Sequence, residues 1–108
     1  MAAGVIRGEV RLYRFPSPDK QRPVVVLTRG VAITHLSSVT VAPITSMIRG
    51  VPSEVVLNQE DGMKHPCAVN LHNLLTVSKL GLGRRLAMLS SERLAEICAA
   101  LGFALGCR

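Results

Sequence analysis

Residues 39–57 constrain the fold most, because they place two short β-branched runs around a segment rich in turn-forming residues. The run at residues 39–41 favours a pleated, half-buried strand. Pro43 then lacks a backbone N–H, so pairing must end or bulge there, or the strand must lie at a sheet edge. A second strand is expected over residues 53–58. The stretch is therefore expected to form a hairpin.

The connection inside this stretch carries groups that can contact phosphate. Thr45 and Ser46 supply hydroxyls, and Arg49 supplies a positive charge. Hydroxyls and a cation at a strand end, held by paired backbone, can form a phosphate-contacting rim. The alternative is an ordinary hairpin in which the Thr and Ser side chains satisfy the turn. The pattern alone leaves both interpretations open.

The remainder of the chain predicts more short strands and then one helix. Strands are expected over residues 5–15, 24–27, 67–77 and 84–89, with less regular segments between them. From Ser90 onward the apolar residues recur at helical spacing, and Gly106 is expected to end that helix. We therefore expect one domain over residues 1–108, mainly β with a C-terminal α-helix packed on a small antiparallel barrel-like sheet.

Charge and cysteine content narrow the possible partners and compartment. The formal net charge of +6 favours a polyanionic partner, namely nucleic acid, an anionic membrane or an acidic protein tail. With one Tyr, two Phe and no Trp, rows of aromatic stacking platforms are not expected. An odd count of three cysteines argues against a disulfide framework. Without a signal peptide or a membrane-spanning run, we expect a cytoplasmic protein.

Metal chemistry and serine hydrolysis are not supported by the residue spacing. His65, Cys67 and His72 are potential zinc ligands, but a tight structural site needs four ligands in closely spaced pairs. No nucleophile-elbow motif accompanies the serines. We therefore expect neither a metal nor another cofactor.

Arg22 is the arginine whose position most suggests chemistry. It stands between a polar loop and a buried strand, and Pro23 stiffens the junction. A guanidinium held there can bind phosphate in bidentate fashion and stabilise charge that develops in a transition state. The alternative role of the Arg22 side chain is to anchor the adjoining loop. Arg84, Arg85 and Arg93 are interpreted as a solvated face.

A series of short motifs runs along nearly the whole chain: RGEV at residues 7–10, QRPVVV at 21–26, APITS at 42–46, IRGVPSEV at 48–55 and LSSERL at 89–94. Together they resemble the MazF/PemK (Kid-like) family of toxin endoribonucleases. The resemblance implies an SH3-like, CcdB/MazF-type barrel, a homodimer, and metal-independent cleavage of single-stranded RNA at short sequences. It also implies a cognate antitoxin whose acidic, flexible tail lies in the RNA groove.

The resemblance places the catalytic arginine of the family on Arg22 and its strand-end hydroxyl on Thr45. RNA cleavage needs the 2′-hydroxyl to attack phosphorus, a base, an acid and a cation that stabilises the transition state. Arg22 suits the last role, and Thr45 can hydrogen-bond a phosphate oxygen. The residues expected to bind substrate are Ser46, Arg49, Lys20, Asn73 and Asp19.

The chain departs from the family pattern at two positions. The first loop is shorter than usual and lacks a glutamate, which leaves Asp19 as its carboxylate. The usual Asp-Gln-x-Arg-Thr segment appears as residues 72–76, with sequence HNLLT, so an acid has become His72. We predict His72 either as a proton carrier in catalysis or as a polar residue at the dimer edge.

Two other function classes remain open on sequence grounds. One is a non-enzymatic CcdB-like toxin that binds a protein target such as gyrase, and the other is a plain RNA-binding regulator. Neither would require Arg22 and Thr45 to act together.

Overall fold

The computed structural model describes residues 4–16 and 21–107. Its strands are β1 (Glu9–Arg14), β2 (Gln21–Val26), β3 (Ser38–Thr45), β4 (Glu54–Leu57), β5 (Cys67–Asn70), β6 (Leu75–Ser78) and β7 (Leu82–Met88). Its helices are α1 (Gly30–Ile33) and α2 (Ser91–Leu105), with single 3₁₀ turns η1 (Gln59–Asp61) and η2 (Lys79–Gly81). No helix in the described part of the chain is both long and apolar enough to span a membrane.

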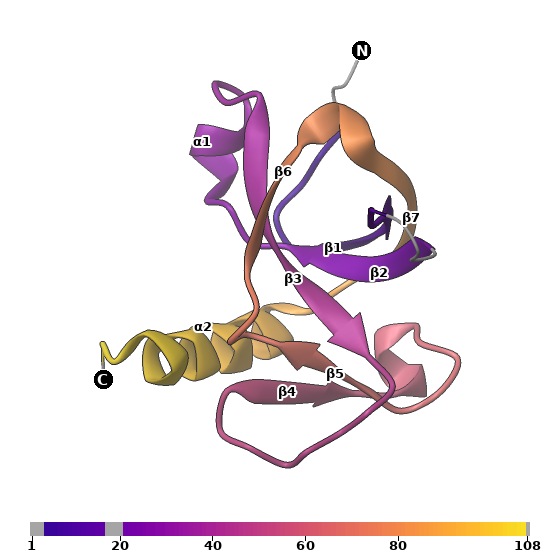
Figure 1. The fold of residues 1–108 in the computed structure, drawn as a ribbon, viewed down its shortest axis with the longest axis vertical. Coiled ribbons are helices and arrows are strands. Elements are labelled where there is room, and N and C mark those ends of the chain that lie inside the picture. The colour runs from indigo at the N-terminus through magenta and orange to yellow at the C-terminus, as the bar shows by residue number, and fades with distance from the viewer. Residues whose placement is uncertain (1–3, 17–20, 108) are drawn as a thin grey trace.

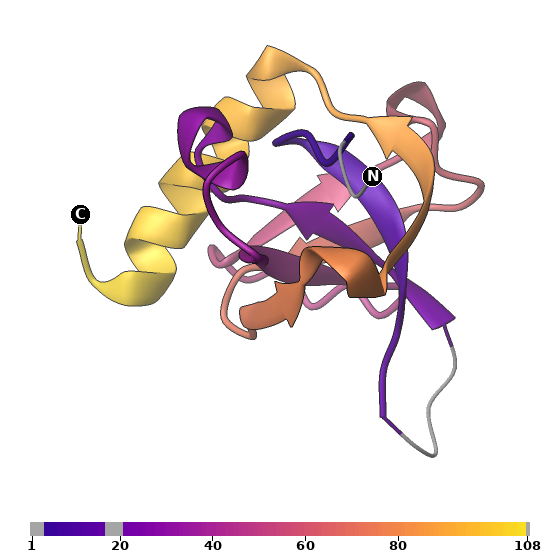
Figure 2. The same cartoon turned by 90° about the horizontal axis from the view of Figure 1, so that it is seen from above.

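The strands form one antiparallel sheet in the order β4-β5-β3-β2-β1-β7, and β6 pairs with β3 (Figure 1). The sheet curves into a barrel-like shape, and Figure 2 shows α2 lying along one side of it. The predicted class, mainly antiparallel β with a C-terminal helix, is confirmed.

Strand β3 is the centre of the sheet, and it changes partner along its length. Its first half pairs with β6 up to Val41, and its last two residues pair with β5 from Ile44 onward. The ladder with β2 ends at Pro43, opposite Val24. The loss of the proline N–H explains why this ladder stops while the strand continues on a new neighbour.

The hairpin expected over residues 39–57 is wrong. Strand β4 pairs with β5, and β5 lies between β4 and β3. The intervening loop is closed by Glu54, whose Oε1 accepts hydrogen bonds from the N–H groups of Arg49 and Gly50, both at 3.0 Å. A carboxylate that binds two backbone donors replaces the turn that a hairpin would have supplied.

Two further sequence expectations are corrected. The strand expected over residues 67–77 is divided into β5 and β6 by an exposed turn containing His72 and Asn73. The less regular segment expected between the strands at residues 24–27 and 39–41 contains the short helix α1. The break between β5 and β6 follows a local pattern, because polar residues between two apolar runs favour a turn.

The core has two parts, one on each side of the sheet. The part beneath α2 contains Val10, Leu57 and Ile97, and the other contains Val24, Val41 and Val77. Burial on both sides explains why residues 24–26 of β2 are a continuous apolar run rather than an alternating one. Helix α2 begins as predicted, with the Ser90 Oγ accepting the Arg93 N–H at 3.2 Å, and ends at Gly106, whose φ is +75°.

Candidate active site

A cleft of about 760 Å³ opens where β2 and β3 separate. Its walls are the adjoining ends of β2 and β3, residues 62–67, and the middle of β7. Four lining residues are basic, and none of the described lining residues is a carboxylate; the four are Arg22, Lys64, Arg84 and Arg85. A cavity with this charge balance attracts an anionic ligand.

Arg22 and Thr45 are brought together in this cleft. The β2–β3 register sets Val24 opposite Pro43, and continuing it by two residues on each strand sets Arg22 opposite Thr45. The β2–β3 ladder has already ended there, and both residues line the opening. Within residues 4–16 and 21–107, the Arg22 guanidinium forms no ion pair with a carboxylate.

Thr45 also stabilises the turn that follows β3. Its Oγ1 accepts a hydrogen bond from the Met47 N–H at 3.1 Å. The interpretation of this hydroxyl as part of an ordinary turn is therefore right in part, but the turn uses only one of its hydrogen-bonding positions. A hydroxyl that accepts one bond can still donate its proton to a ligand, and Ser46 beside it is exposed in the same cleft.

The second wall is a loop that the sequence did not mark as functional. It carries Lys64 and His65, and the latter was considered only as a zinc ligand. An ion pair fixes the base of this loop on α2, because the Arg93 Nε donates to the Asp61 Oδ1 at 2.9 Å. Partial burial alone would raise the pKa of Asp61, but hydrogen bonds from Arg93 and from the Asn58 N–H outweigh it and lower that pKa.

The third wall is β7, whose Arg84 and Arg85 line the cleft. The sequence interpretation of these two arginines as a solvated face is incomplete. Both are exposed, yet the pairing of β7 with β1 sets them beside the ends of β2 and β3. This proximity is a long-range consequence of the topology, and no local motif signals it.

Three predicted site residues do not line the cleft. The His72 ring hydrogen-bonds through Nδ1 to the Ser53 hydroxyl, Asn73 is exposed in the β5–β6 turn, and Arg49 is exposed in the loop closed by Glu54. Two more, Asp19 and Lys20, lie outside the described residues.

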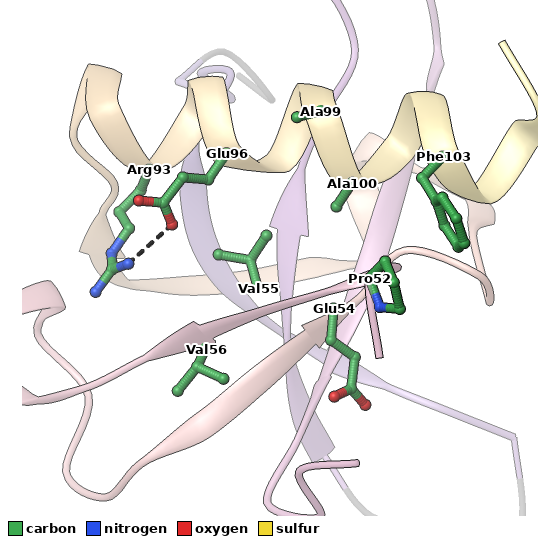
Figure 3. Close-up of a pocket in the computed structure, with 9 residues that line it drawn as sticks. All are labelled: Pro52, Glu54, Val55, Val56, Arg93, Glu96, Ala99, Ala100 and Phe103. Atoms are coloured by element: carbon green, nitrogen blue, oxygen red, sulfur yellow. Dashed lines mark hydrogen bonds and ion pairs between the residues drawn. The ribbon is translucent and has the colours of Figure 1, made fainter. Parts of the chain in front are cut away.

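A second pocket, of about 490 Å³, lies between β4 and α2 (Figure 3). Its walls are mainly apolar, with the Phe103 ring at one end and the Arg93–Glu96 ion pair at the other. Arg93 is bound by two carboxylates, and Glu54 adds another to the lining. A polyanion would meet net negative charge here, so the cleft beside Arg22 is the better candidate for phosphate.

No group of three or more His, Cys, Asp or Glu side chains in the described residues is arranged to hold a metal ion. The basic groups that line the cleft are three guanidinium groups and one ammonium group.

Comparison with known proteins identifies the family. Residues 6–105 match the model of the PemK-like, MazF-like toxins of type II toxin–antitoxin systems. The chain therefore belongs to this family, as the sequence motifs predict.

Individual relatives agree with the family match over most of the chain. The chain is 46% identical over 108 residues to the probable endoribonuclease MazF5 of Mycobacterium tuberculosis, covering 99% of this chain and 98% of that protein. It is 40% identical over 84 residues to the endoribonuclease MazF3 of the same species, covering 78% and 82%. Among solved structures, the M. tuberculosis toxin MazF-mt6 superposes with a TM-score of 0.84 at 34% identity, covering 93% and 98%.

Proposed function

We propose that this chain is the toxin of a type II toxin–antitoxin system and acts as a sequence-specific endoribonuclease on single-stranded RNA. The observation that carries the proposal is the cleft that combines Arg22 and Thr45 with further cations and no described carboxylate. The names of the relatives MazF3 and MazF5, both endoribonucleases, support the same reaction. Cleavage of cellular RNA would inhibit translation and growth.

The reaction uses the substrate's own nucleophile. The 2′-oxygen forms a bond to the adjacent phosphorus, the bond from phosphorus to the 5′-oxygen breaks, and a 2′,3′-cyclic phosphate results. One proton leaves the 2′-hydroxyl, and another reaches the departing 5′-oxygen. Arg22 stabilises the negative charge on the phosphorane-like transition state, and Thr45 donates a hydrogen bond to a phosphate oxygen. The guanidinium supplies positive charge at the phosphate, so we propose a metal-independent reaction.

We assign proton transfer to His65 rather than to His72. Histidine is the side chain that ordinarily changes charge between about pH 5 and 8, so it can serve as base and acid near neutrality. Of the two, His65 lines the cleft, whereas the His72 ring is bound to Ser53. For the catalytic role predicted for His72, its ring would have to reach the substrate although it is not among the described residues that line the cleft.

The proposed partners follow from charge and family. A cleft with no described carboxylate attracts the acidic, flexible tail of a cognate antitoxin as well as RNA, and such association is steered electrostatically. The functional unit is a homodimer in the cytoplasm, with no membrane partner. Large apolar side chains exposed in the protomer, including Met47, Phe103 and Leu105, support association with a second copy.

A cleavage assay in EDTA tests the proposal against its alternatives. The wild-type protein is incubated with a long single-stranded RNA and, in parallel, with the same sequence as DNA, which lacks the 2′-hydroxyl. We expect RNA fragments ending in a cyclic phosphate and intact DNA. A gel shift without cutting would indicate an RNA-binding regulator. The absence of both cutting and RNA binding would favour a toxin that binds a protein target.

A further inference from the structure

Glu9 is a buried carboxylate that the proposed reaction does not use. The residue is 3% exposed, and its carboxylate is fully engaged. Its Oε1 accepts hydrogen bonds from the Ile6 N–H at 2.8 Å and from the Arg11 guanidinium at 2.9 Å. Its Oε2 accepts from the Arg85 guanidinium at 3.4 Å. A buried charge of this kind requires a partner, and here it joins two arginines on neighbouring strands.

A bulge in β7 brings these arginines opposite each other. Val10 of β1 pairs with Ala87, but the next residue, Arg11, pairs with Arg85, so Leu86 is the extra residue. Bulges redirect side chains and are frequent beside active sites. Two like charges directly opposite on a sheet are destabilising, and the Glu9 carboxylate between them offsets this repulsion.

The two arginines are held differently. Arg11 is 15% exposed, and its Nε also donates to the Gly83 carbonyl at 2.6 Å, so its fork is directed into the protein. Arg85 is 52% exposed and lines the cleft, and Glu9 is its ion-pair partner among the described residues. A guanidinium has five N–H donors, so most of those on Arg85 are available to a ligand.

We propose that Arg85, oriented by Glu9, binds an RNA phosphate other than the one that is cleaved. Arg22 and Arg85 lie on the two strands that flank β1, and strands in these positions are about 10 Å apart. The register also offsets them along β1, because Arg22 stands opposite Tyr13 and Arg85 opposite Arg11. Arg85 is therefore placed to contact a different phosphate of the same RNA strand from the one at Arg22. This inference rests on the proposed RNA-cleaving function and adds a second phosphate subsite to it, with Glu9 as a positioning residue.

The salt dependence of RNA binding tests the subsite directly. The probe is a single-stranded 2′-O-methyl oligonucleotide, which cannot be cut. Arg85→Ala should reduce the slope of log affinity against log salt by about 0.7, the change for one contact to a single-strand phosphate. On cleavable RNA, KM should rise about tenfold while kcat stays within about threefold. Arg29→Ala, which removes an exposed arginine at the start of α1, is the matched control and should change neither quantity.

Glu9→Gln distinguishes a role of Glu9 in positioning Arg85 from a general effect of its negative charge on RNA binding. The substitution makes the protein more positive, so an electrostatic role alone would strengthen RNA binding. Positioning predicts weaker binding in the wild-type background and no further effect when combined with Arg85→Ala. If Glu9→Gln does not fold, Arg85→Lys serves instead. It should restore the salt slope but not the KM, because an ammonium lacks the planar fork that Glu9 orients.

The failures of the two proposals are distinguishable. A wild-type protein that does not cut RNA would contradict the proposed function. Normal cutting by the wild type, with an unchanged salt slope in Arg85→Ala, would contradict the phosphate subsite alone.

Discussion

Asp61 and Arg93 connect the loop that forms one wall of the cleft to helix α2, through a hydrogen-bonded ion pair of 2.9 Å. The other oxygen of the Asp61 carboxylate, Oδ2, accepts the Asn58 N–H at 2.9 Å and so caps the turn η1. One carboxylate therefore fixes both the turn η1 and its position on the helix. The residues that line the cleft begin at the next position, Gly62. Stability and cleft geometry therefore depend on the same side chain.

This ion pair predicts a specific loss of stability in acid. The folded-state pKa of Asp61 is lowered, so its contribution is present above the unfolded-state value of 3.8 and is lost as the pH falls through the folded-state value. Asp61→Asn should cost about 1.5–3 kcal/mol near neutral pH, the value of a hydrogen bond to a charged group. The difference between the variant and the wild type should begin to shrink only as the pH falls below 3.8, and it should vanish once the pH is below the lowered folded-state pKa. Urea unfolding across this range measures the difference, and parallel pH profiles would contradict the assignment.

Gly62 should tolerate substitution less well than Gly50. Both have positive φ, +92° and +74°, so alanine is strained at either position by roughly 1–2 kcal/mol. A Cβ on Gly62 would also lie 3.0 Å from the Ala87 Cβ, whereas Gly50 faces open space. Gly62→Ala should therefore lower the melting temperature further and raise KM, because the loop must move away from β7. Equal effects of the two substitutions would show that the packing of Gly62 on β7 is unimportant.

The two histidines should differ in their effect on the rate of cleavage. His65→Ala should lower the rate by about 100-fold, the usual scale for a general acid or base. His72→Ala should leave the rate close to the wild-type value, because that ring is bound to Ser53 outside the cleft lining. Single-turnover rates of the two variants distinguish the histidines, and a large loss in His72→Ala alone would reverse the assignment.

The contribution of Thr45 to cleavage should depend on its hydroxyl group rather than on the shape of its side chain. Thr45→Val removes the group that bonds the Met47 N–H and, in the proposed reaction, a phosphate oxygen. The cleavage rate should fall by about 100-fold, as on removal of a transition-state donor, while Thr45→Ser should stay close to the wild type. Comparable rates for the Val and Ser variants would exclude the hydroxyl from the chemistry.

Local sequence patterns were sufficient to predict those elements that neighbouring residues determine. The helical stripe after Ser90, its serine cap and its terminal glycine are all properties of consecutive residues. Pro43 marked the end of the β2–β3 ladder for the same reason, because a missing donor acts at its own position. The family motifs then placed Arg22 and Thr45 together, and the structure locates both in one cleft.

The rest of the site depends on contacts between distant segments. The hairpin expected over residues 39–57 was wrong because β5, which follows later in the chain, inserts between β3 and β4. Lys64 and His65 reach the cleft because Asp61 is bound to a helix some 30 positions further on, and Arg85 does so because β7 pairs with β1. Local sequence patterns do not specify which of these distant segments pair with one another.

The central claim is that the Arg22 guanidinium stabilises the transition state of RNA cleavage. The most direct measurement is the single-turnover cleavage rate of Arg22→Ala in EDTA, with Arg29→Ala as the charge-matched control and circular dichroism to verify the fold. We predict a loss of at least about 100-fold for Arg22→Ala and a normal rate for the control. A folded Arg22→Ala protein that cuts RNA at the wild-type rate would contradict the mechanism.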